Sequence, residues 1–399
     1  MTDDAPLLLV SAHVEGVVRV LTLPDGTEVH RLTGRHLSEH AGFLALPHGR
    51  VACVDDQRGE LLVLDPFGGE LVTATVPVAV PAEHLAADPS GRWVAVTTGL
   101  GKNPTPWSDL VTVVDLATGD AARVRTRADE PGVTVLGGED PLVVLRHRAP
   151  GALAVHRFAG LLGAPPGCPQ AAPHAEVPLP SDGHGDAQDP VHGDVFAATG
   201  AGVHRARRDG GTLVPGPPIP WEAPGRGWYL RLDPVRRALW STVRGGPPDP
   251  VRWPEWTNHA WRHDLESGRT DLTALGPGLV FRLALARDHA VFTRVHPDGD
   301  ELILLHTGGD LRRCPLPPMD GAPRRGGSPW EGVQRRAVAA SPDAGWVAVT
   351  RGGHGHVHVV DARTGEEAAL LHAGTELRHG GHLMMRTRSD GAEGDPVGR

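Results

Sequence analysis

Two kinds of turn alternate along this chain, and their alternation limits the fold more than any other feature of the sequence. The first kind follows a short apolar run and usually precedes an apolar strand. It is built from Pro, Gly and Asp, which supply the dihedral angles and local hydrogen bonds that turns require. It occurs at eight places: Leu46–Gly49, Asp88–Gly91, Gly137–Asp140, Asp189–Gly193, Asp233–Arg236, Ala286–His289, Ser341–Gly345 and Arg388–Gly391.

The second kind of turn closes an outer hairpin and mostly follows an alternating strand such as Val111–Val114 or Val357–Val360. Alternation and short β-branched runs indicate strands, and no window keeps the 3.6-residue apolar period of a helix. These turns are Leu23–Gly26, Asp65–Gly69, Asp115–Gly119, Phe158–Gly163, Arg208–Gly211, Asp264–Gly268, Thr307–Asp310 and Asp361–Gly365.

The two kinds of turn interleave in strict order at a spacing of roughly 40 to 50 residues, the period of a propeller blade. The stretch from Glu83 to Val124 is one complete copy, a four-stranded meander. One meander cannot bury both faces of its sheet, so neighbouring copies must stack radially. We predict an all-β fold: an eight-bladed β-propeller of four-stranded antiparallel blades, with seven blades as the alternative. It forms one domain over residues 1–391, followed by a disordered tail at 392–399.

The two ends of the chain complement each other. Gly381–Arg386 has the pattern of an inner strand with nothing after it to pair with. The chain begins with the strands that should follow it, at Leu7–Val10, Val17–Leu21 and Glu28–Leu32. We therefore expect the C-terminal strand to complete the first blade and close the ring.

The turns and the strands before them resemble those of the tryptophan-aspartate-repeat and YVTN-type propeller families over nearly the whole chain. The matching residues are Val113-Val114-Asp115 with Thr118-Gly119, Val359-Val360-Asp361 with Thr364-Gly365, Asp88-Pro89-Ser90-Gly91 and Ser341-Pro342-Asp343. The resemblance implies the propeller fold and a rigid face of loops that binds a partner. It implies no particular activity, because the Trp-Asp dipeptide and a consistent Gly-His are absent.

Charge and composition exclude several classes of partner. A formal net charge of −9 disfavours nucleic acid and anionic membranes, both of which need a basic surface. No export signal and no membrane-length apolar run is visible, and the three cysteines Cys53, Cys168 and Cys314 form neither a disulfide framework nor a zinc pattern. We expect a cytoplasmic protein that is a monomer or a small homo-oligomer.

The 23 histidines suggest chemistry at one end of the central channel. When the inner strands are aligned on their turns, His382, His40 and Glu130 take equivalent positions in three blades. His84 follows two residues deeper, on the same side of its strand, and His184 enters from the fifth blade. Three imidazoles and a carboxylate with an open position suit Fe, Cu or Zn, so these residues are the candidate metal ligands.

Other side chains at the same mouth are candidates for holding a ligand. Arg335 and Arg336 could hold an anionic group. The segment Gly245–Arg262 and the neighbouring Trp228-Tyr229 concentrate aromatic residues, which form either a lid over the channel or a loop folded over its own blade. The candidate ligand-binding residues are Arg335, Arg336, Trp228, Tyr229, Trp256, His259 and His354.

Two functions follow from these candidates. The first is a binding platform that presents a His-rich loop face to a small molecule or peptide. The alternative is a metal-dependent enzyme with Fe, Cu or Zn at the channel mouth, and a haem-binding propeller with one axial histidine also stays open. A purely structural role for these polar residues is the third interpretation, because inner-strand starts commonly hydrogen-bond around a channel. Neither a phosphate-binding Gly-x-x-x-x-Gly-Lys-Ser/Thr motif nor a Gly-x-Ser-x-Gly nucleophile motif is present.

Overall fold

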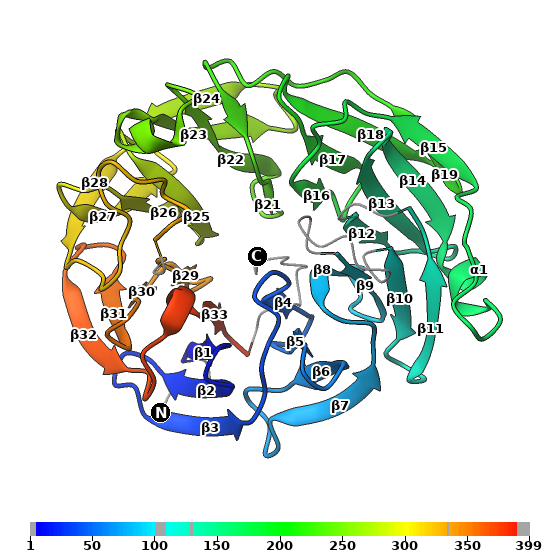
Figure 1. Ribbon diagram of the computed structural model, residues 1–399, viewed down its shortest axis with the longest axis horizontal. Helices are drawn as coiled ribbons and strands as arrows, with labels where there is room; N and C mark the ends of the chain where they lie inside the picture. Colours follow the sequence, from blue (N-terminus) through cyan, green and yellow to red (C-terminus); the bar gives the residue numbers. More distant parts are fainter. Residues whose placement is uncertain (1–4, 100–108, 128–130, 333–334, 389–399) are drawn as a thin grey trace.

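The computed structural model describes residues 5–99, 109–127, 131–332 and 335–388. Eight antiparallel sheets stand around a central axis, and one edge strand of each sheet lies next to that axis (Figure 1). The all-β, eight-bladed prediction is confirmed, and the seven-bladed alternative is wrong. No helix in the described part of the chain is long and apolar enough to cross a membrane.

The first four blades follow the predicted meander, and their strands run from the inside to the outside of the ring. They are β33 (His382–Arg386), β1 (Leu7–Ala12), β2 (Val17–Thr22) and β3 (Glu28–Thr33); β4 (Phe43–Ala45), β5 (Val51–Asp55), β6 (Glu60–Leu64) and β7 (Val72–Pro77); β8 (Ala82–Ala87), β9 (Trp93–Thr98), β10 (Leu110–Asp115) and β11 (Asp120–Arg125); β12 (Gly132–Leu136), β13 (Leu142–Arg148), β14 (Gly151–Arg157) and β15 (Ala175–Pro178).

The last four blades repeat this order, except that the inner strand of the sixth blade is split in two. They are β16 (Asp186–Gln188), β17 (Val195–Ala198), β18 (Val203–Asp209) and β19 (Thr212–Pro215); β20 (Arg226–Gly227) and β21 (Arg231–Asp233) with β22 (Ala238–Gly245), β23 (Thr257–Asp264) and β24 (Thr270–Ala274); β25 (Leu279–Leu285), β26 (His289–Val295), β27 (Asp300–His306) and β28 (Leu311–Leu316); β29 (Val338–Ala340), β30 (Trp346–Arg351), β31 (His356–Asp361) and β32 (Glu367–His372).

The ring closes as predicted from the two ends of the chain. Strand β33 pairs antiparallel with β1, with Leu8 opposite Met385 and Val10 opposite Leu383. The buried guanidinium of Arg386 donates to the carbonyl of Leu46, which ties the first blade to the second. The last strand is therefore fastened both within its own blade and to its neighbour.

Alternate residues of the middle strands pack against opposite neighbouring blades. On β5, Val51 and Cys53 face the first blade, whereas Ala52 and Val54 face the third. Successive side chains of a strand point to opposite faces, and both faces are covered here, so every residue of β5 is buried. This explains why the middle strands are continuous apolar runs rather than alternating ones.

The first kind of turn owes its shape to aspartate side chains. Asp88 accepts hydrogen bonds from the backbone N–H groups of Ser90, Arg92 and Trp93, so a carboxylate replaces a missing backbone acceptor. At one predicted outer turn, Phe158–Gly163, the chain instead forms the short helix α1 (Phe158–Leu162). That helix buries Phe158 and Leu161 between the third and fourth blades.

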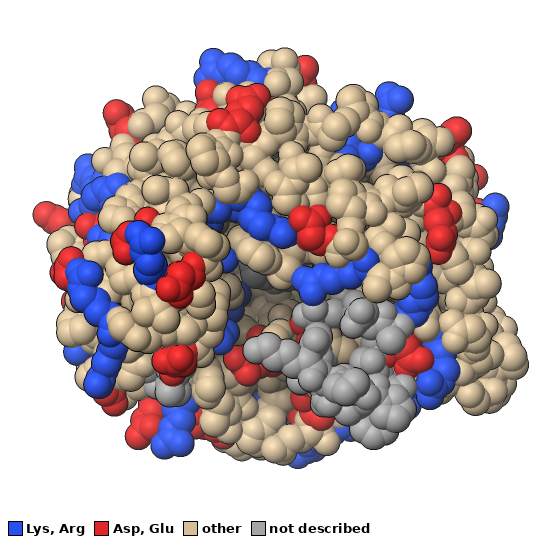
Figure 2. All heavy atoms as spheres, turned by 45° about the horizontal axis from the view of Figure 1, so that its top comes forward, with Lys and Arg blue, Asp and Glu red and all other residues tan. Residues whose placement is uncertain are grey.

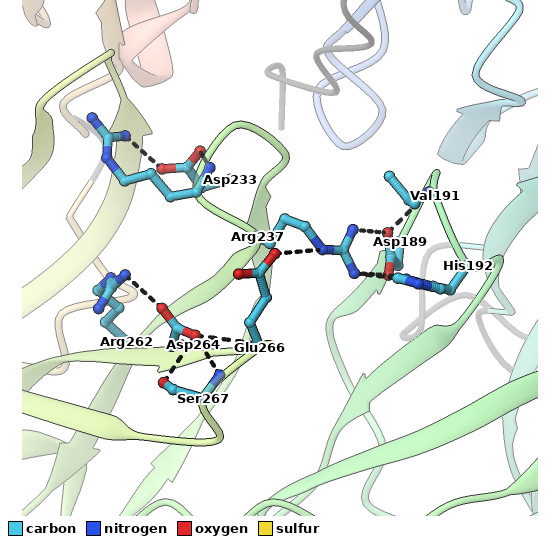
Figure 3. A network of polar contacts seen from close by, with 10 residues as sticks. Asp189, Val191, His192, Asp233, Arg237, Arg262, Asp264, Glu266 and Ser267 are labelled. Carbon is cyan, nitrogen blue, oxygen red and sulfur yellow. Dashed lines mark hydrogen bonds and ion pairs between the residues drawn. The ribbon is translucent and has the colours of Figure 1, made fainter.

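Charged residues join neighbouring blades by ion pairs as well as apolar contacts. Arg146 and Asp186 pair at 2.7 Å between the fourth and fifth blades. Figure 3 shows a similar link from the fifth blade to the sixth, where the buried carboxylate of Asp189 accepts from Arg237, which also faces Glu266. These arginines have fixed carboxylate partners and therefore contribute to assembly of the ring.

Candidate functional site

A cavity open to solvent lies on the inner strands of the first, second, sixth, seventh and eighth blades. We call it the axial cavity. Several Gly and Ala residues in its walls leave space that larger side chains would fill. Figure 2 shows a hollow at the centre of the ring with basic side chains gathered along one edge. The described residues that line the axial cavity are His40, Ala41, Gly42, Phe43, Arg231, Arg282, Leu283, Ala284, Ala337, Val338, Ala339, Ala340, Gly381, His382, Leu383, Met384 and Met385.

The charge of the axial cavity comes from two arginines, Arg231 and Arg282. None of its described lining residues is Asp or Glu. Arg282 lies on β25 beside a β-bulge, where the pairing shifts between Val280 and Arg282. Bulges re-aim the side chain that follows them, and this one turns a cation out of an otherwise apolar strand.

Arg282 is not neutralised within the described part of the chain. Its guanidinium makes no hydrogen bond or ion pair there, and its carbon lies 5.1 Å from the centroid of the Phe281 ring. Burial lowers the pKa of Arg282, and the nearby charge of Arg335 lowers it further. Arginine stays protonated in proteins, so the cavity keeps this positive charge.

His382 contributes a neutral imidazole. Burial, followed by the charge of Arg282, lowers the pKa of His382 to about 3. Its ring lies 5.2 Å from that of His13, whose pKa burial also lowers. At neutral pH both rings are uncharged, so His382 offers the cavity hydrogen-bonding groups rather than charge.

A further arginine, Arg244, lies among indole rings outside the residues that line the axial cavity. The guanidinium carbon of Arg244 lies 4.5 Å from the ring centroid of Trp256, 5.3 Å from Trp228 and 5.7 Å from Trp330. Burial lowers the pKa of Arg244 to about 10, so it remains charged at pH 7. The faces of the indoles stabilise this charge by cation–π attraction.

The aromatic segment Gly245–Arg262 covers the next blade rather than only its own. Its 3-10 helix η1 (Pro250–Glu255) starts at Asp249, whose side chain accepts from the N–H of Val251. Trp253 and Trp256 are buried in a small apolar cluster with Leu279 and Val295 of the seventh blade and Met319. The segment therefore packs over the seventh blade, which differs from both expectations, a lid over the channel and a loop folded over its own blade.

The structure brings two of the candidate metal ligands to one cavity, and His84 and His184 are not among the residues that line it. His40 and His382 both line the axial cavity. His184 lies against Trp228, with ring centroids 5.2 Å apart, and Glu130 is outside the described residues. Among the described residues, no group of three or more His, Cys, Asp or Glu side chains is placed to hold a metal ion.

A β-bulge explains why His84 is not among the described residues lining the axial cavity. Ala82 pairs with Thr98 and His84 pairs with Thr97, so Glu83 is an extra residue on β8. A bulge breaks the alternation on which the expectation for His84 rested. Glu83 is buried instead, and its carboxylate lies 3.1 Å from Nδ1 of His40.

Arg336, predicted to hold a ligand, has partners within the protein. Its side chain is fully buried, pairs with Asp300 at 2.8 Å and donates to the carbonyls of Thr350 and Pro317, so it joins the seventh and eighth blades. Arg335, in contrast, is 40% exposed and faces Glu39 at 3.8 Å. Both arginines line one pocket with Trp330, and their binding of a ligand stays a prediction.

The other candidate ligand-binding residues lie in three separate places. Trp228 and Trp256 lie against Arg244, and the hydroxyl of Thr242 donates to the hydroxyl of Tyr229 at 2.7 Å. His259 is half-buried within strand β23, and His354 is exposed on the eighth blade, where it stacks on His356.

Sequence reasoning missed Arg231 and Arg282, which charge the axial cavity, and Arg244, which lies against Trp256. The signal was present for one of them, because Arg282 interrupts the apolar strand Leu279–Leu285. A charged residue inside an inner strand must either pair with a neighbouring blade or face the axis. The histidine pattern predicted His40 and His382 at the channel, and both line the axial cavity, but it did not indicate the arginines that carry the charge of this cavity.

Comparison with known proteins supports the fold. No family model and no curated protein sequence matches the chain significantly. Two structures of AztD from Citrobacter koseri, one of them the apo form, are 12% identical, with TM-scores of 0.65 and 0.66 over 96% of this chain and 98% of AztD. The chain is a β-propeller.

Two further propellers resemble it. Dihydro-heme d1 dehydrogenase NirN, solved in complex with DHE, is 16% identical with a TM-score of 0.60, over 96% of this chain and 75% of that one. The Cps50 (Swd1) β-propeller domain of Myceliophteria thermophila is 13% identical with a TM-score of 0.51, over 83% and 99% of the two chains. At these identities the likeness concerns the fold alone.

Proposed function

We propose that this protein is a binding protein that takes a small anionic molecule into the axial cavity. The observation that carries the proposal is the Arg282 guanidinium, which is half-buried, faces the cavity and has no carboxylate partner among the described residues. Desolvating an unpaired charge costs free energy, and a bound anion would recover it. A concave site with a few convergent polar groups is also the usual form of a small-molecule site.

The ligand we expect carries a carboxylate or a phosphate. A guanidinium binds either group with two parallel hydrogen bonds. Neutral His382 and the half-exposed His40 also line the cavity and would add hydrogen bonds. That a propeller of related fold was solved in complex with a small molecule, DHE, agrees with such a role.

Calorimetric titration with acetate, malonate and inorganic phosphate tests the proposal. We expect at least one of them to bind, and the affinity to fall about tenfold or more in Arg282→Met, since charged hydrogen bonds contribute on the order of 1.5–3 kcal/mol. The matched control is Arg363→Met, in an outer turn where the side chain is 77% exposed. Equal affinities in wild type and Arg282→Met, or no binding by any of the three probes, would overturn the proposal.

Metal analysis of protein purified without a polyhistidine tag tests the metal-dependent alternative. His40 and His382 still share the cavity, so the alternative predicts a stoichiometric Fe, Cu or Zn that is lost in a His40→Ala/His84→Ala double variant. The binding proposal predicts no stoichiometric metal in either protein.

A further inference from the structure

We propose that the ligand is amphipathic: its anionic group lies in the axial cavity and an apolar, preferably aromatic, arm lies in a second pocket beside it. This inference rests on the proposed function and names the class of molecule that the site takes. The second pocket, which we call the aromatic pocket, is a shallow depression open to solvent, whose walls include Leu279, Phe281, Val295, Trp330, Arg335 and Arg336.

Phe281 joins the two openings. It sits at the bulge of β25, directly before Arg282. The guanidinium carbon of Arg282, in the axial cavity, lies 5.1 Å from the Phe281 ring centroid. That of Arg335, in the aromatic pocket, lies 5.7 Å from the same centroid. One aromatic ring therefore separates a cation of the first opening from a cation of the second, and one small molecule could contact both.

Trp330 is the feature that points to an apolar arm. It is 47% exposed and is the one aromatic side chain among the large apolar side chains exposed in the described residues. Its ring lies 6.2 Å from Phe281 and 6.3 Å from Trp256 and tilts toward both without stacking. An indole held at the surface costs free energy unless something covers it, and an apolar group in the aromatic pocket would cover it.

The wall that carries Trp330 is fixed to the blades at several points. It belongs to the long connection between β28 and β29, whose Met319 packs in the cluster with Trp253 and Leu279. The carbonyl of Pro318 accepts from Arg351 at 2.8 Å, and Arg325 pairs with Asp298 at 2.6 Å. Met319 and the hydrogen bond from Arg351 therefore fix the start of this connection against the blades, whereas the exposed Arg325–Asp298 pair contributes little.

The charges beside the two openings determine where the anionic group and the apolar arm of the ligand would lie. Arg335 has a partner in Glu39, but the pair is 3.8 Å apart and both side chains are about two-fifths exposed, so its contribution is small. A carboxylate lying near the edge of Phe281 would be attracted by Arg282 and Arg335 together. A neutral apolar molecule would make contacts in the aromatic pocket but would lack this electrostatic attraction.

A matched series of small probes tests this inference: acetate, octanoate, phenylacetate and 2-phenylethanol, each titrated by calorimetry into the full chain. We expect phenylacetate to bind at least tenfold more tightly than acetate, and 2-phenylethanol to bind more weakly than phenylacetate. Trp330→Ala should remove most of the gain of phenylacetate over acetate. Leu272→Ala, an exposed apolar residue on the outer strand β24, is the matched control and should leave the gain intact.

The outcomes separate this inference from the proposed function. If acetate and phenylacetate bind equally and Arg282→Met weakens both, the anion site stands and the apolar arm is overturned. If Trp330→Ala leaves the gain of phenylacetate unchanged, the aromatic pocket is not where the arm lies, and the inference is again overturned. If no carboxylate binds, or Arg282→Met changes nothing, the proposed function fails and the inference fails with it.

Discussion

Arginine has opposite roles in two regions of the molecule: the contacts between neighbouring blades, and the axial cavity. Between the seventh and eighth blades, Arg336 is fully buried, pairs with Asp300 and donates to two carbonyls. In the axial cavity, Arg282 lies against an aromatic ring and has no carboxylate partner among the described residues. A protein stabilises a buried charge with a fixed counter-charge where the charge has a structural role. A cation left unpaired beside a cavity indicates a place where the counter-charge comes from outside.

The largest effect should follow from removing a paired arginine. Arg336→Met leaves the carboxylate of Asp300 buried without its partner, and breaking such a pair costs on the order of 3–5 kcal/mol. We expect the free energy of unfolding, measured by urea denaturation, to fall by this amount. A loss below about 1 kcal/mol would show that the pair is not what holds these two blades together, and would weaken the contrast with Arg282.

Asp189 should show the next largest effect, in the network of Figure 3. Burial alone would raise the pKa of Asp189, but hydrogen bonds from Arg237 and His192 lower it to about 2. We expect Asp189→Asn to lose on the order of 1–3 kcal/mol at pH 7. Because the folded pKa is depressed, the wild-type advantage is present above the unfolded pKa of about 3.9 and is lost as the pH falls toward 2.

Denaturation of wild type and Asp189→Asn at pH 7, 4 and 2.5 measures that window. The difference between the two proteins should be constant from pH 7 to about pH 5 and should shrink below pH 4. A difference that is the same at pH 2.5 as at pH 7 would show that Asp189 contributes through packing or neutral hydrogen bonds and not through its charge.

A buried histidine within a blade should have a smaller effect on stability, and this effect should depend on pH. His147 is 1% exposed, and burial followed by the charge of Arg127 lowers its pKa to about 3. The folded state therefore binds this proton less readily than the unfolded state, whose pKa is about 6.5. Stability should fall as the pH drops below 6.5, by at most about 1.4 kcal/mol per pH unit for this group.

His147→Gln removes the titrating group and should flatten the dependence of stability on pH between about 6.5 and 4. His174→Gln is the control, since that imidazole is exposed at the surface and hydrogen-bonds the carbonyl of Gly211. If stability depends on pH equally steeply in His147→Gln and in wild type, then protonated His147 contacts solvent or a partner in the folded protein.

The sequence predicted the fold well because propeller geometry is encoded locally. Each turn carries its own Asp, Pro or Gly, and a buried strand such as Val51–Asp55 reads as an apolar run whatever its neighbours are. Ring closure was also predictable, since β33 and β1 are the two unpaired halves of one blade. The helix α1 was missed because a single turn of helix around Phe158 leaves no periodic signal.

The site was predicted less well because it depends on two bulges. The bulge at Glu83 carries that residue inward and removes the expected equivalence of His84 with His40. The bulge at Phe281 turns Arg282 toward the axial cavity. One inserted residue reverses which side chains share a side of a strand, and a period of two in the sequence does not show where such an insertion lies. Arg335 and Arg336 make the same point, because adjacent residues have opposite burial.

The smallest change in stability should come from Arg282, and its sign matters more than its size. Removing an unpaired, half-buried cation takes away a desolvation cost and loses only the contact with Phe281. We therefore expect the free energy of unfolding of Arg282→Met to lie within about 1 kcal/mol of the wild-type value and to be slightly higher. Residues kept for binding are often suboptimal for stability. Urea denaturation without added ligand measures this change, with Arg363→Met as the exposed control. If Arg282→Met were as unstable as Arg336→Met, Arg282 would have a counter-charge in the folded protein, and the axial cavity would no longer need an anion from solution.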